Sequence, residues 1–333
     1  MMIPDISQRL MIALVGDLVL TEQDRQWLRH PAVGGVILFT RNFADSEQLR
    51  QLTASVRRAA GKPILIAVDQ EGGRVRRFCG DDFLALPAMG ILVENPAVLH
   101  DAGMVMAAEV LAAGVDLSFA PVLDLAYGRS QVIGNRAFSA DSESAAKFAL
   151  SFSDGMAAAG MASCGKHFPG HGYAEADSHS AFAVDERTFA EIAAADLQVF
   201  ARCAQAGMPA MMTAHIAYPQ CDSAAATFST FWVKEILRGQ LAYKGLIVSD
   251  DLTMAGAAIG DMTSRMKAAL DVGVDVLLVC QPPAVEEALS TGLPAKENTD
   301  NPWLALAPRF DGRVDVGSVA YWKARKHVLS VIN

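Results

Sequence analysis

The sequence predicts a single α/β domain over residues 1–333, folded as a (β/α)8 TIM barrel. Eight short apolar runs recur along the chain, and most are followed by a longer segment with helical spacing. The runs are almost continuously apolar (ILIAVD, LIVSD, VLLVC), as strands buried on both faces of a parallel sheet require. No G-x-G-x-x-G follows the first run and no G-x-x-x-x-G-K-[ST] occurs, which disfavours the open nucleotide-binding sheets. Eight units in one chain of this size favour the closed barrel.

The expected elements alternate from the first run to the last. Strands are predicted at residues 10–15, 35–40, 64–69, 115–121, 162–167, 209–215, 245–250 and 274–280. Helices are predicted at residues 22–29, 46–60, 97–113, 142–159, 186–206, 229–241 and 263–272. Several helices are expected to begin after a capping side chain, namely Asp45, Asp141, Asp185 and Thr263. Residues from about 296 to 316 are expected to be irregular, and an amphipathic closing helix is expected at about 318–331.

The composition argues against disordered, nucleic-acid-binding and membrane-spanning proteins. The 333 residues are 52% hydrophobic and carry a net charge of −9, so a large core forms and disorder is excluded. The acidic balance argues against nucleic acid or an anionic membrane as partner, because either would need clustered Lys and Arg. No apolar stretch approaches the ~18 residues of a membrane span, and the five cysteines are scattered without a C-x-x-C pair. We therefore expect a monomeric cytoplasmic enzyme acting on a small molecule.

Polar residues end most of the predicted strands. They are Asp17, Arg41, Asp69, Asp124, Lys166, His167, His215 and Asp250. In a barrel the carboxyl ends of the strands share one face, where active sites are built. The sequence therefore predicts a functional site on that face.

The densest signal is KHFPGHG at residues 166–172, followed by Asp177, Ser178 and His179. His167, His171, Asp177 and His179 could bind a metal, although no helix-spaced pair such as H-E-x-x-H is present. The histidines could instead only order the loop through hydrogen bonds to the backbone. In a third interpretation, Asp177 orients His179 and stabilises its protonated form, which makes His179 a general acid/base near neutral pH.

Two further strand ends carry acids. Asp250 could cap the next helix, or it could be a carboxylate nucleophile at the barrel mouth, with Asp251 as its neighbour. Asp69 begins the segment DQEGGRVRR, whose arginine forks suit sugar hydroxyls or anions, unless the segment is only a solvated loop. Arg136 adds a further arginine. We expect Lys166 and Arg136 to balance the charge of Asp250.

Together, KHFPGHG with DSH, AVDQEGGRVxR, IGxRxF, a strand-end MxAH and a strand-end SDD resemble glycoside hydrolase family 3, and within it the bacterial β-N-acetylglucosaminidases of cell-wall recycling. The resemblance implies a retaining glycosidase with Asp250 as nucleophile, His179 as proton donor and acceptor, and Asp177 as the dyad partner of His179. It places substrate binding on five residues: Asp69, Arg77, Arg136, Lys166 and His167. It implies a cytoplasmic enzyme. None of the motifs has a metal-coordination pattern, and an acid/base with a nucleophile suffices for glycosyl transfer to water, so we expect neither a metal nor an organic cofactor.

Rival functions remain open at this stage. One rival is a phosphorylase, which replaces water by phosphate, because a cationic His–Asp acid/base repels an anionic acceptor less than a carboxylate would. Another is a family 3 glycosidase of broader specificity. A metal-dependent amidohydrolase-like barrel and a non-catalytic sugar-binding protein are further alternatives. The aglycone could be an anhydro-muramoyl peptide, another muropeptide or a chitin fragment.

Overall fold

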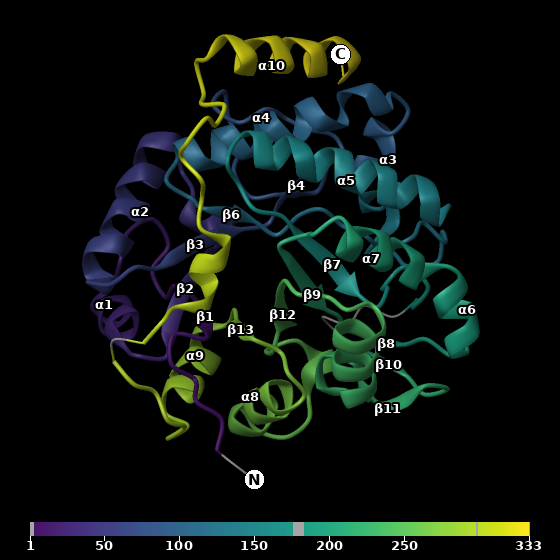
Figure 1. Cartoon of the computed structure of the whole chain (residues 1–333). Helices are drawn as coiled ribbons and strands as arrows, with labels where there is room; N and C mark the ends of the chain where they lie inside the picture. Colours follow the sequence, from purple (N-terminus) through teal and green to yellow (C-terminus); the bar gives the residue numbers. More distant parts are fainter. Residues whose placement is uncertain (1–2, 176–182, 298, 333) are drawn as a thin grey trace.

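A parallel barrel forms the centre of the molecule, in a computed structural model that describes residues 3–175, 183–297 and 299–332 (Figure 1). Its strands are β1 (Leu10–Ala13), β2 (Val33–Leu38), β3 (Leu65–Val68), β6 (Leu117–Ser118), β7 (Cys164–Phe168), β9 (Ala210–Thr213), β12 (Leu246–Asp251) and β13 (Val276–Val279). They pair in the order β6-β3-β2-β1-β13-β12-β9-β7. Each strand overlaps one of the eight predicted apolar runs, so the predicted barrel is confirmed.

The two ends of this sheet meet between β6 and β7. Val122, just after β6, forms a parallel bridge with Lys166 of β7. The amide of Leu123 donates to the Lys166 carbonyl at 2.6 Å, and the amide of Cys164 donates to the Ala120 carbonyl at 2.8 Å. The sheet therefore closes through the segment that follows β6.

Helices surround the barrel (Figure 1). They are α1 (Glu22–Arg29), α2 (Ser46–Ala60), α4 (Leu99–Ala112), α5 (Ser142–Ala158), α6 (Phe189–Ala194), α7 (Asp196–Gln205), a π-helical segment (Phe231–Gln240), α8 (Met262–Asp271), α9 (Pro282–Leu289) and α10 (Val319–Ile332). The short helix α3 (Met89–Leu92) lies between β5 and α4. All seven predicted helical segments and the closing helix are helical over most of their length.

The helices differ from the prediction in one break, one additional helix and two capping residues. The expected helix at 186–206 is two helices, because Ala195 leaves the helical conformation (φ −126°, ψ −84°). The helix α9 was not predicted; it begins with two prolines, which the first turn tolerates because its N–H groups have no partner within the helix. Asp45 and Asp141 cap α2 and α5 as expected. The predicted caps Asp185 and Thr263 are wrong, since Thr188 caps α6 and Asp261 caps α8.

Two small sheets are formed by segments that follow the carboxyl ends of barrel strands. The hairpin of β4 (Gln70–Gly72) and β5 (Val75–Arg76) follows β3 directly. A second sheet joins β8 (Ala183–Val184), β10 (Ile216–Tyr218) and β11 (Asp222–Ala225). The hairpin occupies the DQEGGRVRR segment, so this segment is folded structure and not a solvated loop.

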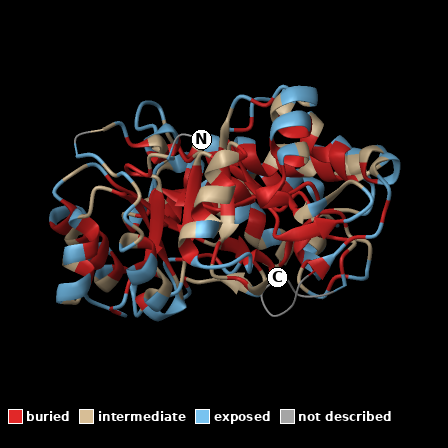
Figure 2. Cartoon of the chain, turned by 90° about the horizontal axis from the view of Figure 1, so that it is seen from below, coloured by how far each residue is buried: buried red, intermediate tan, exposed pale blue. Residues whose placement is uncertain are grey.

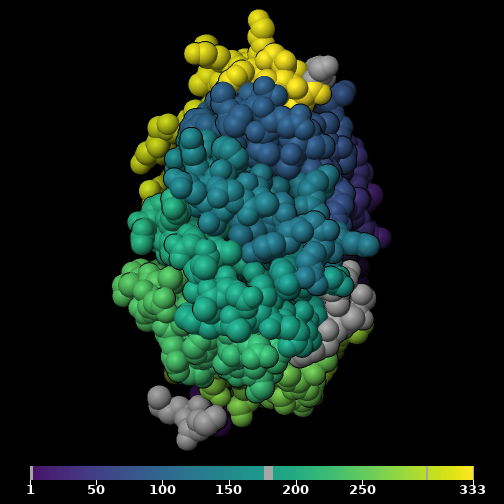
Figure 3. All heavy atoms as spheres, turned by 90° about the vertical axis from the view of Figure 1, so that its right-hand side faces the viewer, coloured from purple at the N-terminus to yellow at the C-terminus, as the bar shows by residue number. Residues whose placement is uncertain are grey.

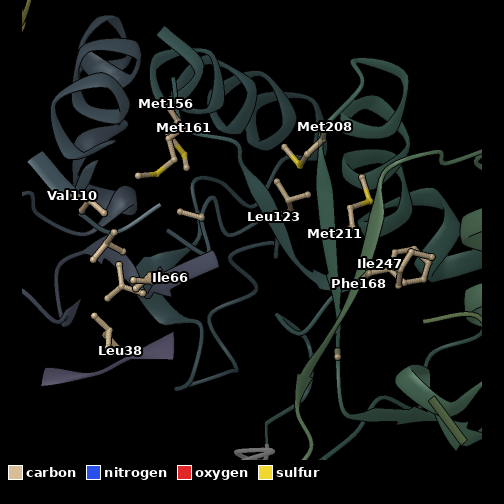
Figure 4. Close-up of a cluster of buried hydrophobic side chains, with 14 of the residues drawn as sticks. Leu38, Ile66, Val110, Leu123, Met156, Met161, Phe168, Met208, Met211 and Ile247 are labelled. Atoms are coloured by element: carbon tan, nitrogen blue, oxygen red, sulfur yellow. The ribbon is translucent and has the colours of Figure 1, made fainter. Parts of the chain in front are cut away.

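Strand side chains alternate between two cores. Met11 and Ala13 of β1 lie in the barrel interior, whereas Leu10 and Ile12 belong to the layer between barrel and helices. Figure 4 shows part of this outer layer, in which Ile66, Met211 and other strand residues meet helix residues such as Val110 and Met156. Buried residues are concentrated in the middle of the molecule (Figure 2). Both faces of each strand are apolar because both are buried.

The C-terminal segment closes the fold at two places. A 3-10 helix at Pro302–Leu306 buries Trp303 at the amino-terminal end of the barrel, where its Nε1 donates to the Arg9 carbonyl at 3.2 Å. The closing helix α10 then lies against α4, as Figures 1 and 3 both show. The region expected to be irregular therefore contains one short helix. Within the described residues, no helix has both the length and the apolar character to cross a bilayer.

Candidate active site

A cavity of about 840 Å³ opens at the carboxyl-terminal end of the barrel. Its apolar lining includes Ile37, Phe39, Phe119, Met212, Met254 and Leu278. Its charged and titratable lining comprises Asp69, Glu71, Arg74, Arg77, Arg136, Lys166, His167, Glu175, Asp250 and Asp251. The sequence placed Asp69, Arg77, Arg136, Lys166, His167 and Asp250 in one site, and the structure brings all six to this cavity.

Irregularities in two strands aim neighbouring residues into the cavity. In a regular strand, successive side chains point to opposite faces. Between β7 and β9 the register shifts between Lys166 and Phe168, and between β12 and β13 it shifts between Val248 and Asp251. One extra residue in a strand re-aims the side chains that follow. Lys166 and His167 therefore both face the cavity, and so do Asp250 and Asp251.

A buried network of charges forms one part of the cavity wall. The Lys166 ammonium, only 3% exposed, lies 2.7 Å from Asp69 Oδ1 and 2.6 Å from Glu71 Oε1. Arg136 donates to Glu71 through Nε and Nη2, both at 2.8 Å. These contacts correct one expectation: Lys166 forms ion pairs with Asp69 and Glu71, and Arg136 with Glu71, whereas both cations were expected to balance the charge of Asp250.

The network keeps Glu71, Lys166 and Arg136 ionised. Burial alone would raise the pKa of Glu71, but Arg136 and Lys166 outweigh it and hold that pKa well below its usual range. Burial likewise opposes the charge of Lys166, yet Asp69 and Glu71 raise the pKa of its ammonium. Opposite charges a few ångströms apart stabilise each other strongly where water is excluded. The cavity therefore presents fixed cations and anions.

Asp124 organises the two histidines of the KHFPGHG segment. Its Oδ2 lies 2.7 Å from His167 Nδ1, and its Oδ1 accepts from the amides of His167 and His171 at 3.2 and 2.7 Å. Burial would raise the pKa of Asp124, but His167 outweighs it and the pKa is lowered. Burial and the neighbouring His167 lower the pKa of His171 to about 4. His171 is thus neutral at pH 7, and Asp124 fixes which His167 nitrogen faces the cavity.

The two consecutive acids of β12 have different surroundings. Asp251 accepts from the amides of Thr253 (2.9 Å) and Cys280 (3.0 Å) and from the Thr253 hydroxyl, so it ties down the strand end. Asp250 Oδ1 accepts from the amide of Asp251 at 2.8 Å, and its carboxylate lines the cavity. The next helix, α8, is capped by Asp261. The capping alternative for Asp250 is therefore wrong.

Arg77 stands nearer to solvent than the buried network. Its Nη2 lies 3.9 Å from Asp69 Oδ2, and its guanidinium lies over the Phe39 ring, 5.9 Å from the centroid. Asp69 thus has Lys166 on one oxygen and Arg77 near the other. Two cations keep this carboxylate in one orientation, and it can still accept hydrogen bonds from two neighbouring hydroxyls of a sugar.

The predicted dyad of Asp177 and His179 lies within residues 176–182, outside the described part of the chain, so it stays a prediction. The described residues contain no group of three or more His, Cys, Asp or Glu arranged to hold a metal ion.

Sequence reasoning missed three buried residues of the site as supporting groups. Glu71 was visible only as the acid in DQEGGR, and Asp124 and His215 only as polar strand ends. His215 is fully buried, lies 3.1 Å from the Asp251 carbonyl through Nε2 and stacks on Phe228. For Glu71 the signal that could have identified it is its place two residues after Asp69, and for Asp124 and His215 it is their place at the carboxyl ends of two of the eight apolar runs.

The matches with known proteins agree with this geometry. Residues 6–302 match the glycosyl hydrolase family 3 N-terminal domain. The chain is 53% identical over 279 residues to a β-hexosaminidase of Bordetella avium, covering 81% of this chain and 80% of that one. It is 52% identical over 277 residues to a β-hexosaminidase of Pseudomonas aeruginosa, covering 82% of each.

A solved structure gives the same result over nearly the whole fold. The crystal structure of NagZ from Neisseria gonorrhoeae in complex with N-trifluoroacetyl-D-glucosamine superposes with a TM-score of 0.89 at 38% identity. The match covers 99% of this chain and 100% of that one. From the matched family domain, the cavity at the carboxyl ends of the strands and these relatives, the chain belongs to glycosyl hydrolase family 3, within its group of bacterial β-hexosaminidases, and is a glycoside hydrolase.

Proposed function

We propose that the protein removes terminal β-linked N-acetylglucosamine from its substrates by hydrolysis with retention of configuration. The observation that carries the proposal is the position of Asp250 in the same cavity as the Asp69–Lys166–Glu71–Arg136 network. A cavity of about 840 Å³ is large enough for a disaccharide. The β-hexosaminidase relatives, and the N-acetylglucosamine analogue bound by the Neisseria enzyme, support the choice of sugar.

In the proposed first step, the Asp250 carboxylate attacks the anomeric carbon and the bond to the aglycone oxygen breaks. A proton from His179 goes to the departing oxygen, and Asp177 stabilises the imidazolium that delivers it. The sugar is then covalently bound to Asp250 with inverted configuration. This acid is a histidine, whereas most retaining glycosidases use a second carboxyl group about 5 Å from the nucleophile.

In the second step, water attacks the same carbon while His179 takes its proton. The bond to Asp250 breaks, and the second inversion restores the β configuration. The remaining residues of the cavity would hold the sugar: Asp69 accepts from hydroxyl groups, whereas Lys166, Arg136 and Arg77 donate to them. Asp124 would keep the ring of His167 oriented throughout both steps.

The direct test is hydrolysis of 4-nitrophenyl β-N-acetylglucosaminide, followed by proton NMR of the first-formed sugar. We expect release of N-acetylglucosamine as the β anomer, with the corresponding β-glucoside a much poorer substrate. The α anomer formed first would refute the double displacement. A preference for the β-glucoside would refute the assigned sugar. Formation of the sugar 1-phosphate in phosphate buffer would instead identify a phosphorylase.

We further propose that the natural substrates are muropeptides released during cell-wall turnover and recycled in the cytoplasm. The support is the resemblance carried by residues 166–179 and by the strand-end motifs. Deleting the gene in its host should cause N-acetylglucosaminyl-anhydromuramoyl peptides to accumulate in the cytosolic extract, detected by mass spectrometry. An unchanged muropeptide pool would contradict this substrate assignment.

A further inference from the structure

Glu71 is a buried carboxylate at the site to which the family resemblance assigns no role. It lies in β4, directly after β3, where the chain turns into the β4–β5 hairpin. Gly72 and Gly73 make this turn with φ of +119° and +57°, and a Cβ on Gly72 would come within 2.6 Å of the Pro87 carbonyl. Glycine is favoured where φ is positive and another backbone approaches closely. The turn thus fixes the backbone on which Glu71 sits.

Both oxygens of Glu71 accept hydrogen bonds from cations of the sugar-binding set. Oε1 contacts Lys166 Nζ at 2.6 Å and Arg136 Nη2 at 2.8 Å, and Oε2 contacts Arg136 Nε at 2.8 Å. The side chain is only 5% exposed. Arg136 Nη1 also donates to the Val132 carbonyl at 3.1 Å. Its guanidinium is therefore held in one plane by two anchors, which is the arrangement that fixes where its remaining N–H groups point.

Lys166 and Arg136 both keep N–H groups that are not used by protein acceptors among the described residues. A guanidinium has five N–H groups and an ammonium has three. Within the described part of the chain, three of the guanidinium N–H groups are used by Glu71 and Val132, and two of the ammonium N–H groups by Asp69 and Glu71. Both cations line the cavity. Lys166 and Arg136 therefore each keep at least one N–H donor for a ligand hydroxyl. The hydrogen bonds to Glu71 determine the orientation of these donors.

Glu71 also sets the charge around Asp250. The cations Lys166, Arg136 and Arg77 share the cavity with the anions Asp69, Glu71, Asp250 and Asp251. Among the described residues, further titratable groups near Asp250 include His167, His171, His215, Cys164 and Cys280. Burial lowers the pKa of His171 and His215 and raises the pKa of the two thiols. Without Glu71, Lys166 and Arg136 would carry unbalanced positive charge in the same low-dielectric cavity as Asp250. That charge would stabilise the Asp250 carboxylate in its resting state.

We propose that Glu71 is a positioning residue for glycoside cleavage. It orients the N–H donors of Lys166 and Arg136 toward the sugar, and its negative charge balances these two cations so that they do not over-stabilise the Asp250 carboxylate. The proposal rests on the proposed function, because it assumes that the cavity binds the N-acetylglucosaminyl unit and that Asp250 attacks it. Glu71 acts through the two cations and does not itself react.

The test compares Glu71→Gln with Glu109→Gln. Glu109 is a buried glutamate of α4 that contacts Leu84 and Tyr321 away from the cavity, so its variant controls for the loss of a buried carboxylate. For each protein, kcat and KM for the nitrophenyl substrate are measured from pH 4 to 9. Binding of N-acetylglucosamine is measured by calorimetry, and Tm is recorded.

For Glu71→Gln we expect KM and the Kd for N-acetylglucosamine to rise on the order of 10- to 100-fold, because charge-assisted hydrogen bonds lose their alignment. We also expect the acid limb of kcat/KM to move to lower pH, since the released cations favour ionised Asp250. Glu109→Gln should change neither KM nor the acid limb. A Glu71→Gln enzyme with wild-type KM and acid limb would overturn the proposal.

A charge-conserving variant covers the case in which Glu71→Gln does not fold. Glu71→Asp keeps the negative charge but withdraws it by one methylene, so KM should rise while the acid limb stays in place. A wild-type KM in Glu71→Asp would overturn the positioning role. If the wild-type enzyme neither cleaves the nitrophenyl substrate nor binds N-acetylglucosamine, the proposed function itself fails, which is a distinguishable result.

Discussion

The two ends of the barrel are closed differently: apolar side chains fill the amino-terminal end, whereas charged side chains surround an open cavity at the carboxyl-terminal end. At the amino-terminal end, Trp303 and Leu306 fill the opening, and Asn301 donates to the carbonyls of Gly34 and Pro63. At the carboxyl-terminal end, Lys166, Glu71 and their partners bring buried charges to an open cavity.

This difference separates stability from function. A buried aromatic residue adds to the stability of the fold, since apolar burial is favourable in itself. A buried ion pair gains little over apolar residues of similar volume, because desolvation offsets most of the attraction. The charged end is therefore explained by ligand binding and catalysis, and the apolar end by folding. Each prediction below tests this division.

The largest effect is expected for Asp250→Asn. An amide cannot form the glycosyl ester, so kcat should fall on the order of 10⁴-fold or more for good and poor leaving groups alike. Urea denaturation should give an unfolding free energy close to that of the wild type. As the matched control, Asp251→Asn keeps one oxygen for the amides of Thr253 and Cys280 and should retain far more activity. Equal losses in both variants would show that the two acids have been misassigned.

At the opposite end, Trp303→Ala should cost stability without affecting the chemistry. Removing this fully buried ring leaves a cavity against Phe119 and should lower the unfolding free energy by about 3–5 kcal/mol. The folded variant should keep kcat and KM near wild-type values at a temperature well below its Tm. The exposed Trp322 of α10 offers a control, since its removal should cost little. A large rise in KM for folded Trp303→Ala would contradict the claim that the amino-terminal end contributes to stability and not to substrate binding.

Asp124→Asn tests a residue that belongs to both categories. The amide cannot accept hydrogen bonds on both of its atoms, so either His167 Nδ1 or the two backbone amides lose their acceptor. We expect kcat/KM to fall by about 10²-fold and the unfolding free energy by about 1–3 kcal/mol. Steady-state kinetics and denaturant titration on the same sample measure the two. Wild-type kinetics in this variant would show that the orientation of His167 is not used.

The prediction with the smallest effect on activity concerns the pH dependence of stability, at a residue away from both ends of the barrel. Burial raises the pKa of Glu109 to about 7, against the opposing hydrogen bonds from Leu84 and Tyr321. Between pH 4.5 and 7 the folded protein therefore holds a proton that the unfolded chain, with a pKa near 4.5, has lost. This contribution to stability is present below pH 4.5 and declines as pH rises to 7. We subtract the unfolding free energy of Glu109→Gln from that of the wild type. This difference should fall by up to about 3 kcal/mol as the pH rises across that range.

Urea denaturation of both proteins at several values between pH 4.5 and 8 measures this difference. A difference independent of pH would mean that Glu109 titrates normally. The activity profile should be the same for the two proteins, because Glu109 does not line the cavity.

The sequence was sufficient for the barrel and for six of the charged or titratable residues that line the cavity, for a physical reason. Strands buried on both faces must be apolar throughout, so each of the eight runs was visible. The polar residues that end most of them marked the side of the barrel that holds the cavity. The π-helical segment and the break at Ala195 had no such signature. The helix α9 was missed because prolines 282 and 283 look like a break, although the first helical turn tolerates them.

The partners within the site were less predictable than its members. Lys166 and Arg136 were expected to balance the charge of Asp250, yet their ion pairs are with Asp69 and Glu71, because the turn at Gly72 and Gly73 brings Glu71 back to the barrel mouth. The register shifts that aim Lys166 and His167 together into the cavity follow from pairing with β9, a long-range contact. Such contacts leave no local pattern in the sequence.

The central claim is that Asp250 is the group that bonds to the sugar at the charged end of the barrel. The most direct measurement uses a 5-fluoro aryl N-acetylglucosaminide, in which fluorine slows both steps while the good leaving group lets an intermediate accumulate. After denaturation and proteolysis, mass spectrometry should find the sugar on the peptide that contains Asp250, with fragmentation placing it on that residue and not on Asp251. A label on another residue, or inactivation without any covalent sugar, would contradict the account.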